Sequence, residues 1–534
     1  MNNKLWGLLI GLVLTVFFTL PLFNNFSDHL SSRQDGVLIA WLIDWGSHSL
    51  LTGDNFFNAP FFHPQQNTIA YSDQFFSTAL FNIPLKIIQN NFFNSSNQLN
   101  NLIFNHNFHL FAGSILTFWG QYLLTLHLLK SKKIAIFSAI TFAFSSMHLD
   151  YMVHLHTFLI AGLPFYFLFL LKYLETKKNT HLALMSLFLI YQLLNSPLTG
   201  FFIIILSLTS LLNKNIRLII WGNIKQILPF LIGIFFITSF FYWPFLKVTQ
   251  EFNYTRSIRD TAHFSLSANQ LFSTEIIFYF LLFLILLFYK EKKQKTPKYF
   301  WLFFSFTILG GLLMLGPVLK ISGQTFKIFN LPIPLPYTLF YYLFPGFKAF
   351  RSSSRWIIVF LFGLSITLGY LLQMIKLKKN KYKNILINLI SLGTFLLLWF
   401  TQVPQMKLHQ INTNLPQIYQ IIKQRPEKSL AEFPTYVWSQ TNNYYLETDR
   451  LLYQSYHHKK LYNGYSGFIP PLKEDLWHTI SDRLSEPEII KHLKDSGIEL
   501  VLLNINQKES YKNFSSPSYQ LITCQNQTCL YYLK

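Results

Sequence analysis

Two carboxylates stand close behind the first apolar run of this 534-residue chain. Asp35 and Asp44 lie in QDGVLIAWLIDW, which follows the run LWGLLIGLVLTVFFTLPLF. A carboxylate at a membrane surface can serve as a general base toward a hydroxyl group. For Asp35 the alternative is a capping role, because the apolar spacing of residues 36–52 predicts a helix and Asp is a common N-cap. Asp44 follows nine residues later, so on one helix the two carboxylates point in different directions.

A second group of candidate residues is basic. Lys348, Arg351 and Arg355 lie in FPGFKAFRSSSRW, just before an apolar run, and Arg256 lies in YTRSIRD. Arginine binds phosphate through its planar guanidinium group, and a spacing of four allows one helical face to present Arg351 and Arg355. These residues therefore predict contact with a lipid phosphate. The alternative is that their long side chains simply reach ordinary lipid headgroups.

Histidine supplies the third group. His154 and His156 form an H-x-H pair in FSSMHLDYMVHLHTF. A metal site needs a third or fourth ligand at usable spacing, and none follows, so we expect interfacial hydrogen bonding here. No cofactor is predicted, and a divalent metal has no support from ligand spacing. The chain also lacks a Walker loop, a dinucleotide-binding glycine pattern, a G-x-S-x-G elbow and a zinc signature.

The elements that must position these residues are mostly apolar. Hydrophobic residues make up 51% of the chain and charged residues 13%, against about 25% charged residues in soluble domains. Apolar runs of about 20 residues predict a polytopic α-helical membrane protein. The first run lacks a signal-peptide cleavage site, so we expect it to be an uncleaved span. We expect about eleven spans, near residues 4–23, 108–129, 133–149, 155–173, 181–195, 198–213, 225–245, 274–290, 299–318, 356–375 and 384–402.

The distribution of charge predicts the orientation. The formal net charge is +21, but the basic residues form short clusters between apolar runs, so no nucleic-acid partner is expected. Short basic connections face the cytoplasm, which puts the N-terminus there as well. The basic connections lie at 130–133, 172–181, 213–217, 290–298 and 376–383. The extracytoplasmic segments then include 24–107, HLDYMVH (148–154), NSPLTG (195–200), 246–273, 319–355 and all residues after about 403. An even number of spans would instead put the tail in the cytoplasm.

The two cysteines test this orientation. Cys524 and Cys529 are the only cysteines, and they lie in YQLITCQNQTCLYYL, which predicts two strands joined by a four-residue turn. A disulfide between them fits an oxidising compartment. The alternative is a pair of free thiols in a cytoplasmic tail.

The predicted domains are a membrane domain, 1–402, with a long first outer loop, 24–107, and a small α/β or α+β domain, 403–534. In the tail, SLAEFPTY and IELVLLNI predict strands. SEPEIIKHLKDSG predicts a helix that Ser485 caps and Gly497 ends. LYNGYSGFIPP is either a structural turn or a loop that contacts a ligand. In the outer loop, STALFNIPLKII predicts an interfacial or re-entrant helix.

The order of these parts resembles that of the GT-C membrane glycosyltransferases, which use polyprenyl-phosphate sugars. The likeness rests on a first span, an outer segment with an early Asp, many further spans and an outer C-terminal domain. It is carried by DGVLIAWLIDW, FFHPQQNTIAYSD, FAFSSMHLDYMVHLH, FPGFKAFRSSSRW and LYNGYSGFIPP. Among these enzymes the chain looks most like poorly characterised bacterial members, in which Tyr and Arg often stand in place of His63 and His148.

The resemblance implies a mechanism and its participants. Asp35, with Asp44 as the alternative, would take the proton of an acceptor hydroxyl that attacks the anomeric carbon, and the lipid phosphate would leave with inversion. Arg351 and Arg355 would stabilise the departing phosphate. The implied partners are the bilayer of a bacterial inner membrane, a polyprenyl-phosphate-linked hexose or pentose, and a glycan, lipid or protein acceptor. Further substrate contacts would come from Lys348, Arg256, His154, His63 and Asp73.

Two other classes of function fit the sequence. A transporter or flippase would move a lipid-linked sugar through the same basic groove without breaking a bond. Transporters place ionisable residues near the middle of the bilayer, whereas the acids here gather at the predicted outer interface, which favours an enzyme. The second alternative is a membrane scaffold without catalysis.

Overall fold

The computed structural model describes residues 3–92, 98–253, 255–289, 295–375, 377, 380–437 and 442–534. The chain forms two compact units, each built from segments that are distant in sequence. The first comprises Met1–Asn24, Leu110–Phe241 and Thr255–Met406, and the second comprises Asn25–His109, Tyr242–Tyr254 and Lys407–Lys534. The predicted outer loop and the predicted C-terminal domain thus belong to one unit.

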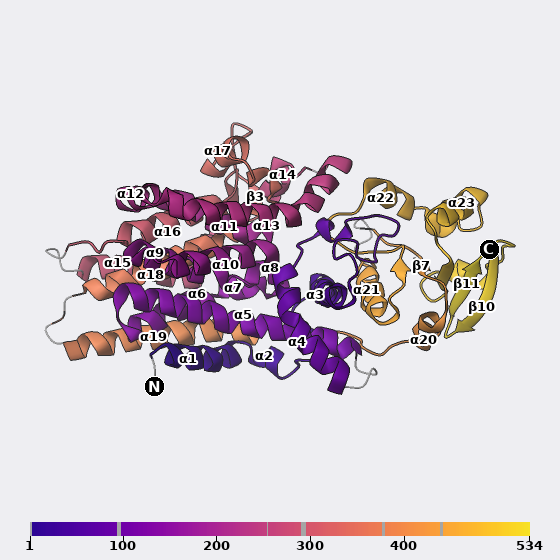
Figure 1. Cartoon of the computed structure of the whole chain (residues 1–534), viewed down its shortest axis with the longest axis horizontal. Coiled ribbons are helices and arrows are strands. Elements are labelled where there is room, and N and C mark those ends of the chain that lie inside the picture. Colours follow the sequence, from indigo (N-terminus) through magenta and orange to yellow (C-terminus); the bar gives the residue numbers. More distant parts are fainter. Residues whose placement is uncertain are drawn as a thin grey trace. The chain divides into compact units, whose positions relative to one another are not determined.

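The first unit is mainly helical, with two short antiparallel strand pairs, β2 (Lys320–Ile321) with β3 (Gln324–Thr325) and β4 (Lys327–Ile328) with β5 (Leu331–Pro332) (Figure 1). Its longest helices contain the apolar runs of the sequence. The helices are α1 (Asn3–Phe18), α2 (Leu20–Phe23), the second part of α5 (Gln98–Leu129), α6 (Lys132–Ala143), α7 (Ser146–Leu149), α8 (Leu155–Phe158), α9 (Gly162–Thr176), α10 (Asn179–Asn195), α11 (Pro197–Ser210), α12 (Lys214–Gly222), most of α13 (Ile224–Glu251), α14 (Ile258–His263), α15 (Thr274–Tyr289), α16 (Phe300–Met314), α17 (Pro336–Leu343), α18 (Ile357–Met374) and α19 (Asn380–Gln402).

Every predicted span overlaps one of these helices, but the number of spans stays a prediction. Among the described residues, length and composition qualify four helices as membrane spans, or up to seven if each bent helix pair is one span. Helices α1 and α16 are apolar but shorter. Breaks within three apolar runs account for the step from four to seven, as between α6 and α7, where the bend is 44°.

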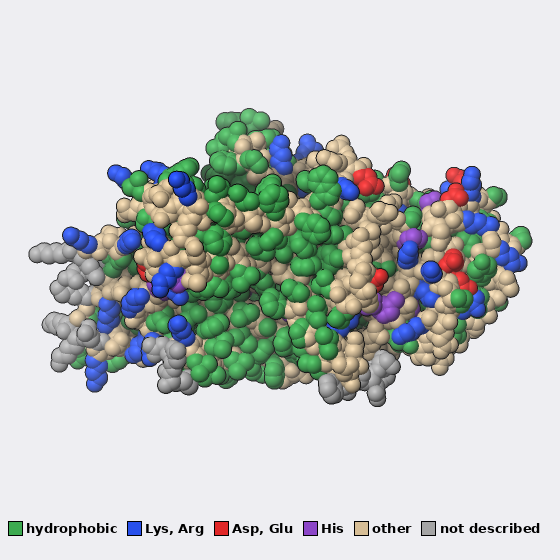
Figure 2. All heavy atoms as spheres, viewed as in Figure 1, with side chains coloured by type: hydrophobic (Ala, Val, Ile, Leu, Met, Phe, Trp, Pro, Cys, Tyr) green, Lys and Arg blue, Asp and Glu red, His purple; other side chains and the backbone are tan. Residues whose placement is uncertain are grey.

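Small and polar side chains hold the helices of the first unit together. A Cβ atom on Gly310 of α16 would lie 2.3 Å from the backbone nitrogen of Phe360, so α16 and α18 approach closely. Gln121 of α5 donates hydrogen bonds to Ser138 (3.1 Å) and to Ser365 (2.8 Å), which joins α5 to α6 and α18. Figure 2 shows a broad apolar surface on this unit, with Lys and Arg gathered around α12 at its left end. Such a distribution is typical of a membrane protein.

The second unit contains a five-stranded sheet in the order β10-β11-β9-β7-β8. Strands β7 (Ser429–Phe433), β8 (Lys460–Leu461) and β9 (Leu500–Asn504) are parallel, and β10 (Tyr519–Gln525) and β11 (Thr528–Leu533) are antiparallel. The tail therefore contains the expected mixed sheet, and the two predicted strands are confirmed as β7 and β9. Its helices are α20 (Gln417–Gln424), α21 (Leu446–His457), α22 (Pro471–Trp477) and α23 (Pro487–Asp495).

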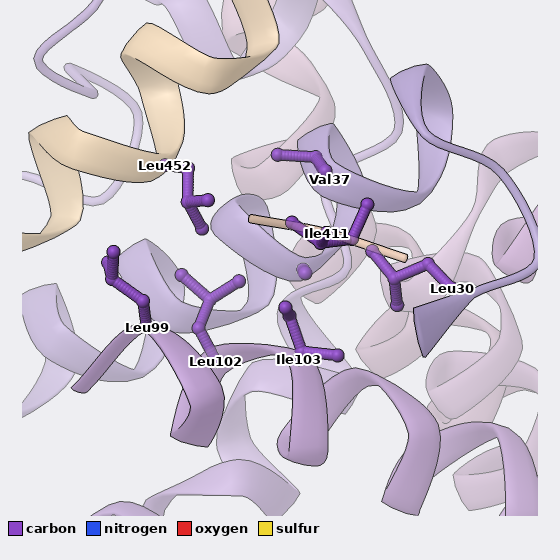
Figure 3. Close-up of a cluster of buried hydrophobic side chains, with 8 residues drawn as sticks. Leu30, Val37, Leu99, Leu102, Ile103, Ile411 and Leu452 are labelled. Atoms are coloured by element: carbon purple, nitrogen blue, oxygen red, sulfur yellow. The ribbon is translucent and has the colours of Figure 1, made fainter. Parts of the chain in front are cut away.

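The remaining elements of this unit come from the first outer segment. They are β1 (His29–Leu30), which pairs with β6 (His409–Gln410), α3 (Gln34–Thr52), α4 (Phe76–Phe92) and the start of α5. Helix α4 covers the segment STALFNIPLKII and packs on α3. Figure 3 shows how Leu30 and Val37, Leu99 and Leu102 of α5, and Leu452 of α21 meet in one buried cluster. This core is complete only when the outer segment and the tail are both present.

Two details of the tail differ from expectation, and the disulfide is confirmed. The last helix begins at Pro487 with Glu486 as its N-cap, so the predicted cap at Ser485 is wrong. Proline is favoured at the first helical position because its missing N–H has no partner there in any case. Cys524 and Cys529 are disulfide-bonded and face each other across β10 and β11. The turn between these strands has two residues, not four.

Candidate functional site

Asp35 lies in the first turn of α3, where a carboxylate favours the positive end of the helix dipole. The N-cap of this helix is Arg33, so the expected capping role of Asp35 is wrong. The Asp35 side chain is half-buried, and its Oδ1 accepts a hydrogen bond of 2.9 Å from the hydroxyl of Tyr465. Tyr465 belongs to LYNGYSGFIPP, the loop for which the sequence left a structural and a ligand-contacting role open.

Three contacts fix the start of α3 on α21. The guanidinium of Arg33 lies 3.9 Å from the ring centre of Tyr445 and pairs with Oδ2 of Asp449 at 3.1 Å. The indole N–H of Trp41 donates to Oε1 of Gln454 at 2.9 Å. The Asp35 carboxylate is thus carried on a helix that the tail holds in place.

Asp44 has different partners, as the predicted helix geometry requires. Its Oδ1 lies 2.6 Å from Nζ of Lys86, and the two side chains are only 14% and 12% exposed. His48 stacks on His458 with ring centres 4.7 Å apart, and burial lowers the pKa of His48, assisted by the charge of Lys86. The Asp44 carboxylate is therefore committed to an ion pair, whereas Asp35 accepts from a neutral hydroxyl.

His63 and Asp73 lie in the same unit as Asp35. The backbone of His63 pairs with Leu461, and its carbonyl accepts from Nζ of Lys473 at 2.8 Å. Burial, followed by the charges of Lys460 and Lys473, lowers the pKa of His63 to about 4. A neutral imidazole at this place acts as a hydrogen-bonding group and not as a cation. Asp73 lies close enough to Tyr242 for its negative charge to act on the tyrosine hydroxyl.

In the first unit, Arg256 and Arg351 lie around one carboxylate. Asp260 of α14 interacts with the charges of both arginines. The Arg351 guanidinium lies 4.3 Å from the ring centre of Phe264. Both arginines, which the sequence predicts as substrate contacts, therefore act on the same carboxylate, although nearly a hundred positions separate them in sequence.

Arg355 belongs to a second small cluster in this unit. Its charge acts on the buried His156, whose ring centre lies 5.7 Å from that of His154. Arg355 lies in the 3₁₀ turn Ser353–Trp356, and α18 begins only at Ile357. The expectation that Arg351 and Arg355 share a face of one α-helix is therefore wrong.

Two other residues considered in the sequence are Lys348 and His148. Lys348 is exposed in a 3₁₀ turn. The ring nitrogens of His148 lie 2.9 Å and 3.0 Å from the carbonyl oxygens of Ala143 and Phe158, and its ring stacks on Phe158. His148 thus joins two short helical segments. In the described parts of the chain no three His, Cys, Asp or Glu side chains gather as metal ligands would.

The sequence analysis missed three charged residues with defined partners. Lys86 lies in the segment predicted as an interfacial helix, and nothing in the local sequence indicates that it pairs with Asp44. Glu275 is buried, and its carboxylate accepts from the backbone N–H and the hydroxyl of Ser146. Lys473 is buried against the ring of Tyr462, 3.6 Å from the ring centre. Each side chain contacts a residue distant in sequence, which local patterns do not reveal.

Comparison with known proteins gives little further information. No protein-family model matches the chain, and no curated protein sequence does either. Among solved structures, the chain is similar to ArnT from Cupriavidus metallidurans in the apo state. The match covers 97% of both chains with a TM-score of 0.49 and 10% sequence identity. A similarity at this level does not assign an activity.

Proposed function

We propose that this chain is a membrane glycosyltransferase that moves a hexose or pentose from a polyprenyl-phosphate donor to an extracytoplasmic acceptor. The observation that carries the proposal is the environment of Asp35. Its carboxylate is partly exposed, lies at the start of a helix and is oriented by the Tyr465 hydroxyl at 2.9 Å. A general base needs this combination of access to the substrate and fixed geometry.

The reaction uses an acidic residue as the base and basic residues as partners of the phosphate. Asp35 takes the proton of the acceptor hydroxyl while the acceptor oxygen forms a bond to the anomeric carbon. The bond from that carbon to the phosphate oxygen breaks, the configuration inverts, and the lipid phosphate leaves as an anion. Arg351 and Arg355 stabilise the charge on this leaving group, since guanidinium groups bind phosphate oxygens strongly.

The apolar helices of the first unit support a substrate held in the membrane. At least four of them have the length and composition of a span, and a polyprenyl chain would lie among lipids beside them. We place the protein in a bacterial inner membrane, with the N-terminus in the cytoplasm and the tail on the opposite side. The disulfide between Cys524 and Cys529 supports this orientation of the tail.

The test compares Asp35→Asn with Asp44→Asn in the purified full-length protein. Release of polyprenyl phosphate is measured with a panel of polyprenyl-phosphate hexoses and pentoses as donors and with glycans, lipids and proteins extracted from the cell envelope as acceptors. Asn can still accept from Tyr465, so Asp35→Asn should fold and bind donor while turnover falls about 10²-fold or more. Asp44→Asn should weaken the pair with Lys86 and lower thermal stability, with turnover per folded molecule retained.

The opposite pattern would place the base at Asp44. Full turnover in both variants would refute general-base catalysis by either residue. If neither the native protein nor the variants release polyprenyl phosphate from any donor of the panel, the result would favour transport or a non-catalytic role.

A further inference from the structure

The parallel strands of the second unit create a place where small ligands commonly bind. Strand β7, labelled in Figure 1, lies between β8 and β9 in the sheet. After β7 the chain passes through α21 to β8, which lies on one side of β7 in the sheet. After β8 it passes through α22 and α23 to β9, which lies on the other side of β7. The connections therefore diverge between β7 and β9. In open α/β sheets, ligands bind beyond the carboxyl ends of two such strands.

A cavity of about 170 Å³ lies at this position. Its walls include Glu432 and Phe433 at the carboxyl end of β7, and Asn504 at the carboxyl end of β9 with Gln507 just beyond it. Pockets for drug-sized ligands measure about 300–1,000 Å³. The cavity is smaller than these, so it suits a single small ring and not a chain of several.

The central polar group of the cavity is Glu432, which is 4% exposed. Its Oε2 accepts from the Tyr419 hydroxyl at 2.7 Å and lies 3.5 Å from Nε of Arg450. Its Oε1 has no hydrogen-bond partner within the described residues. Buried polar atoms nearly always have a partner, so Oε1 is suited to accept a hydrogen bond from a ligand.

The charges of the cavity indicate what kind of ligand fits. Arg450 also pairs with Glu447, at 2.5 Å from Oε1, and donates to the carbonyl of Pro434. The positive charge of Arg450 is thus paired with carboxylates of the protein itself. Asp449 adds a second carboxylate to the lining and pairs with Arg33 on its other side. An anionic ligand would face two carboxylates and no uncommitted cation, whereas a neutral ligand with several hydroxyl groups would find acceptors.

The remaining lining groups match such a ligand. Asn504 and Gln507 are half-buried amides at the edge of the cavity, and amides both donate to and accept from hydroxyl groups. The rings of Tyr419 and Tyr453 line another side. We propose that this cavity binds one neutral sugar ring, with Glu432 and Gln507 as hydrogen-bond partners. The proposal does not depend on Asp35 being a base.

Ligand-observed NMR on the full-length protein tests the proposal, in a detergent without a sugar headgroup. The probes are glucose, galactose, mannose and N-acetylglucosamine, with glucose 6-phosphate as the anionic comparison. At least one neutral probe should bind the native protein and the Asp35→Asn variant equally. The affinity should fall about 10-fold in Glu432→Gln, because the hydrogen bond to the sugar loses its charged acceptor, and in Gln507→Ala, because a hydrogen bond to the sugar is lost. Gln520→Ala, an exposed change on β10, should leave it unchanged.

Three results would overturn the proposal. They are no binding of any neutral probe to the native protein, binding that neither Glu432→Gln nor Gln507→Ala weakens, and tighter binding of glucose 6-phosphate than of glucose. If Glu432→Gln does not fold, Gln507→Ala decides alone, because Gln507 is only half-buried and its loss leaves the sheet intact. Because binding is measured without turnover, a failure here is distinct from a failure of the proposed transferase activity.

Discussion

Acid should destabilise the second unit through His457, the last residue of α21. The side chain is buried, and its Nδ1 accepts a hydrogen bond of 3.0 Å from the backbone N–H of Lys459. A proton on Nδ1 would break this bond. The groups that act on His457 besides burial are His458, Lys459 and Lys423, all of which oppose a further positive charge. Burial, strengthened by these groups, lowers the pKa of His457 from 6.5 to about 3.

The effect on stability follows from the two pKa values. A histidine whose pKa is lowered on folding stays neutral in the native protein, while the unfolded chain binds a proton below about pH 6.5. Its contribution is therefore complete above that pH and is lost as the pH falls toward 3. Each pH unit in this window costs about 1.4 kcal/mol, so at about pH 5 the loss is about 2 kcal/mol.

The measurement is the thermal unfolding of the full-length protein from neutral pH down to about pH 5. His457→Asn keeps an acceptor for the Lys459 N–H but cannot take the proton. It should be less stable than the native protein at neutral pH, because the ring that stacks on Tyr419 is lost, and it should lose less stability on acidification. His409→Asn, at an exposed position, should keep the native slope. An equal slope in His457→Asn and in the native protein would refute the reasoning.

Three further outcomes are expected. Lys86→Met should lower the unfolding temperature, because loss of one partner of a largely buried ion pair costs about 3–5 kcal/mol. The double variant Lys86→Met with Asp44→Leu should regain much of the lost stability, and no recovery would argue against the ion pair. Arg351→Ala and Arg355→Ala should each weaken polyprenyl-phosphate binding about 10-fold, whereas unchanged affinity in both would leave only headgroup contact. A tag after Lys534 should be accessible to a protease in intact spheroplasts, from which the outer membrane has been removed, and accessibility only after their lysis would reverse the predicted orientation.

The local parts of the fold were predictable because they depend on neighbouring residues. The apolar spacing of residues 36–52 predicts α3 to within two residues at its start, and the disulfide follows from two cysteines in adjacent strands. Helix ends were less predictable. Arg33 pairs with Asp449, and the helix starts directly after it, so Asp35 is not the cap. At the last helix the preference of Pro487 for the first position prevails over the capping pattern that starts at Ser485.

The candidate site was predictable only in part. Acids at the start of α3 and arginines before α18 are visible in the sequence, but their partners are not. Tyr465 lies 430 residues after Asp35, and Lys86 lies 42 residues after Asp44. No helical or strand period links positions so far apart. In the sequence, the half-buried Asp35, which accepts from a hydroxyl, therefore looks like the more buried Asp44, which belongs to an ion pair.

The shared core explains why Asp35 depends on the tail. Leu30 and Val37 of the outer segment pack with Ile411 and Leu452 of the tail (Figure 3), so hydrophobic burial holds the two segments together. The Tyr465 hydroxyl then adds direction, because a hydrogen bond orients the carboxylate whereas apolar contacts do not. The outer segment thus supplies the carboxylate, and the tail fixes how that carboxylate is oriented. A change in the tail that loosens this core should therefore disturb the site without touching Asp35.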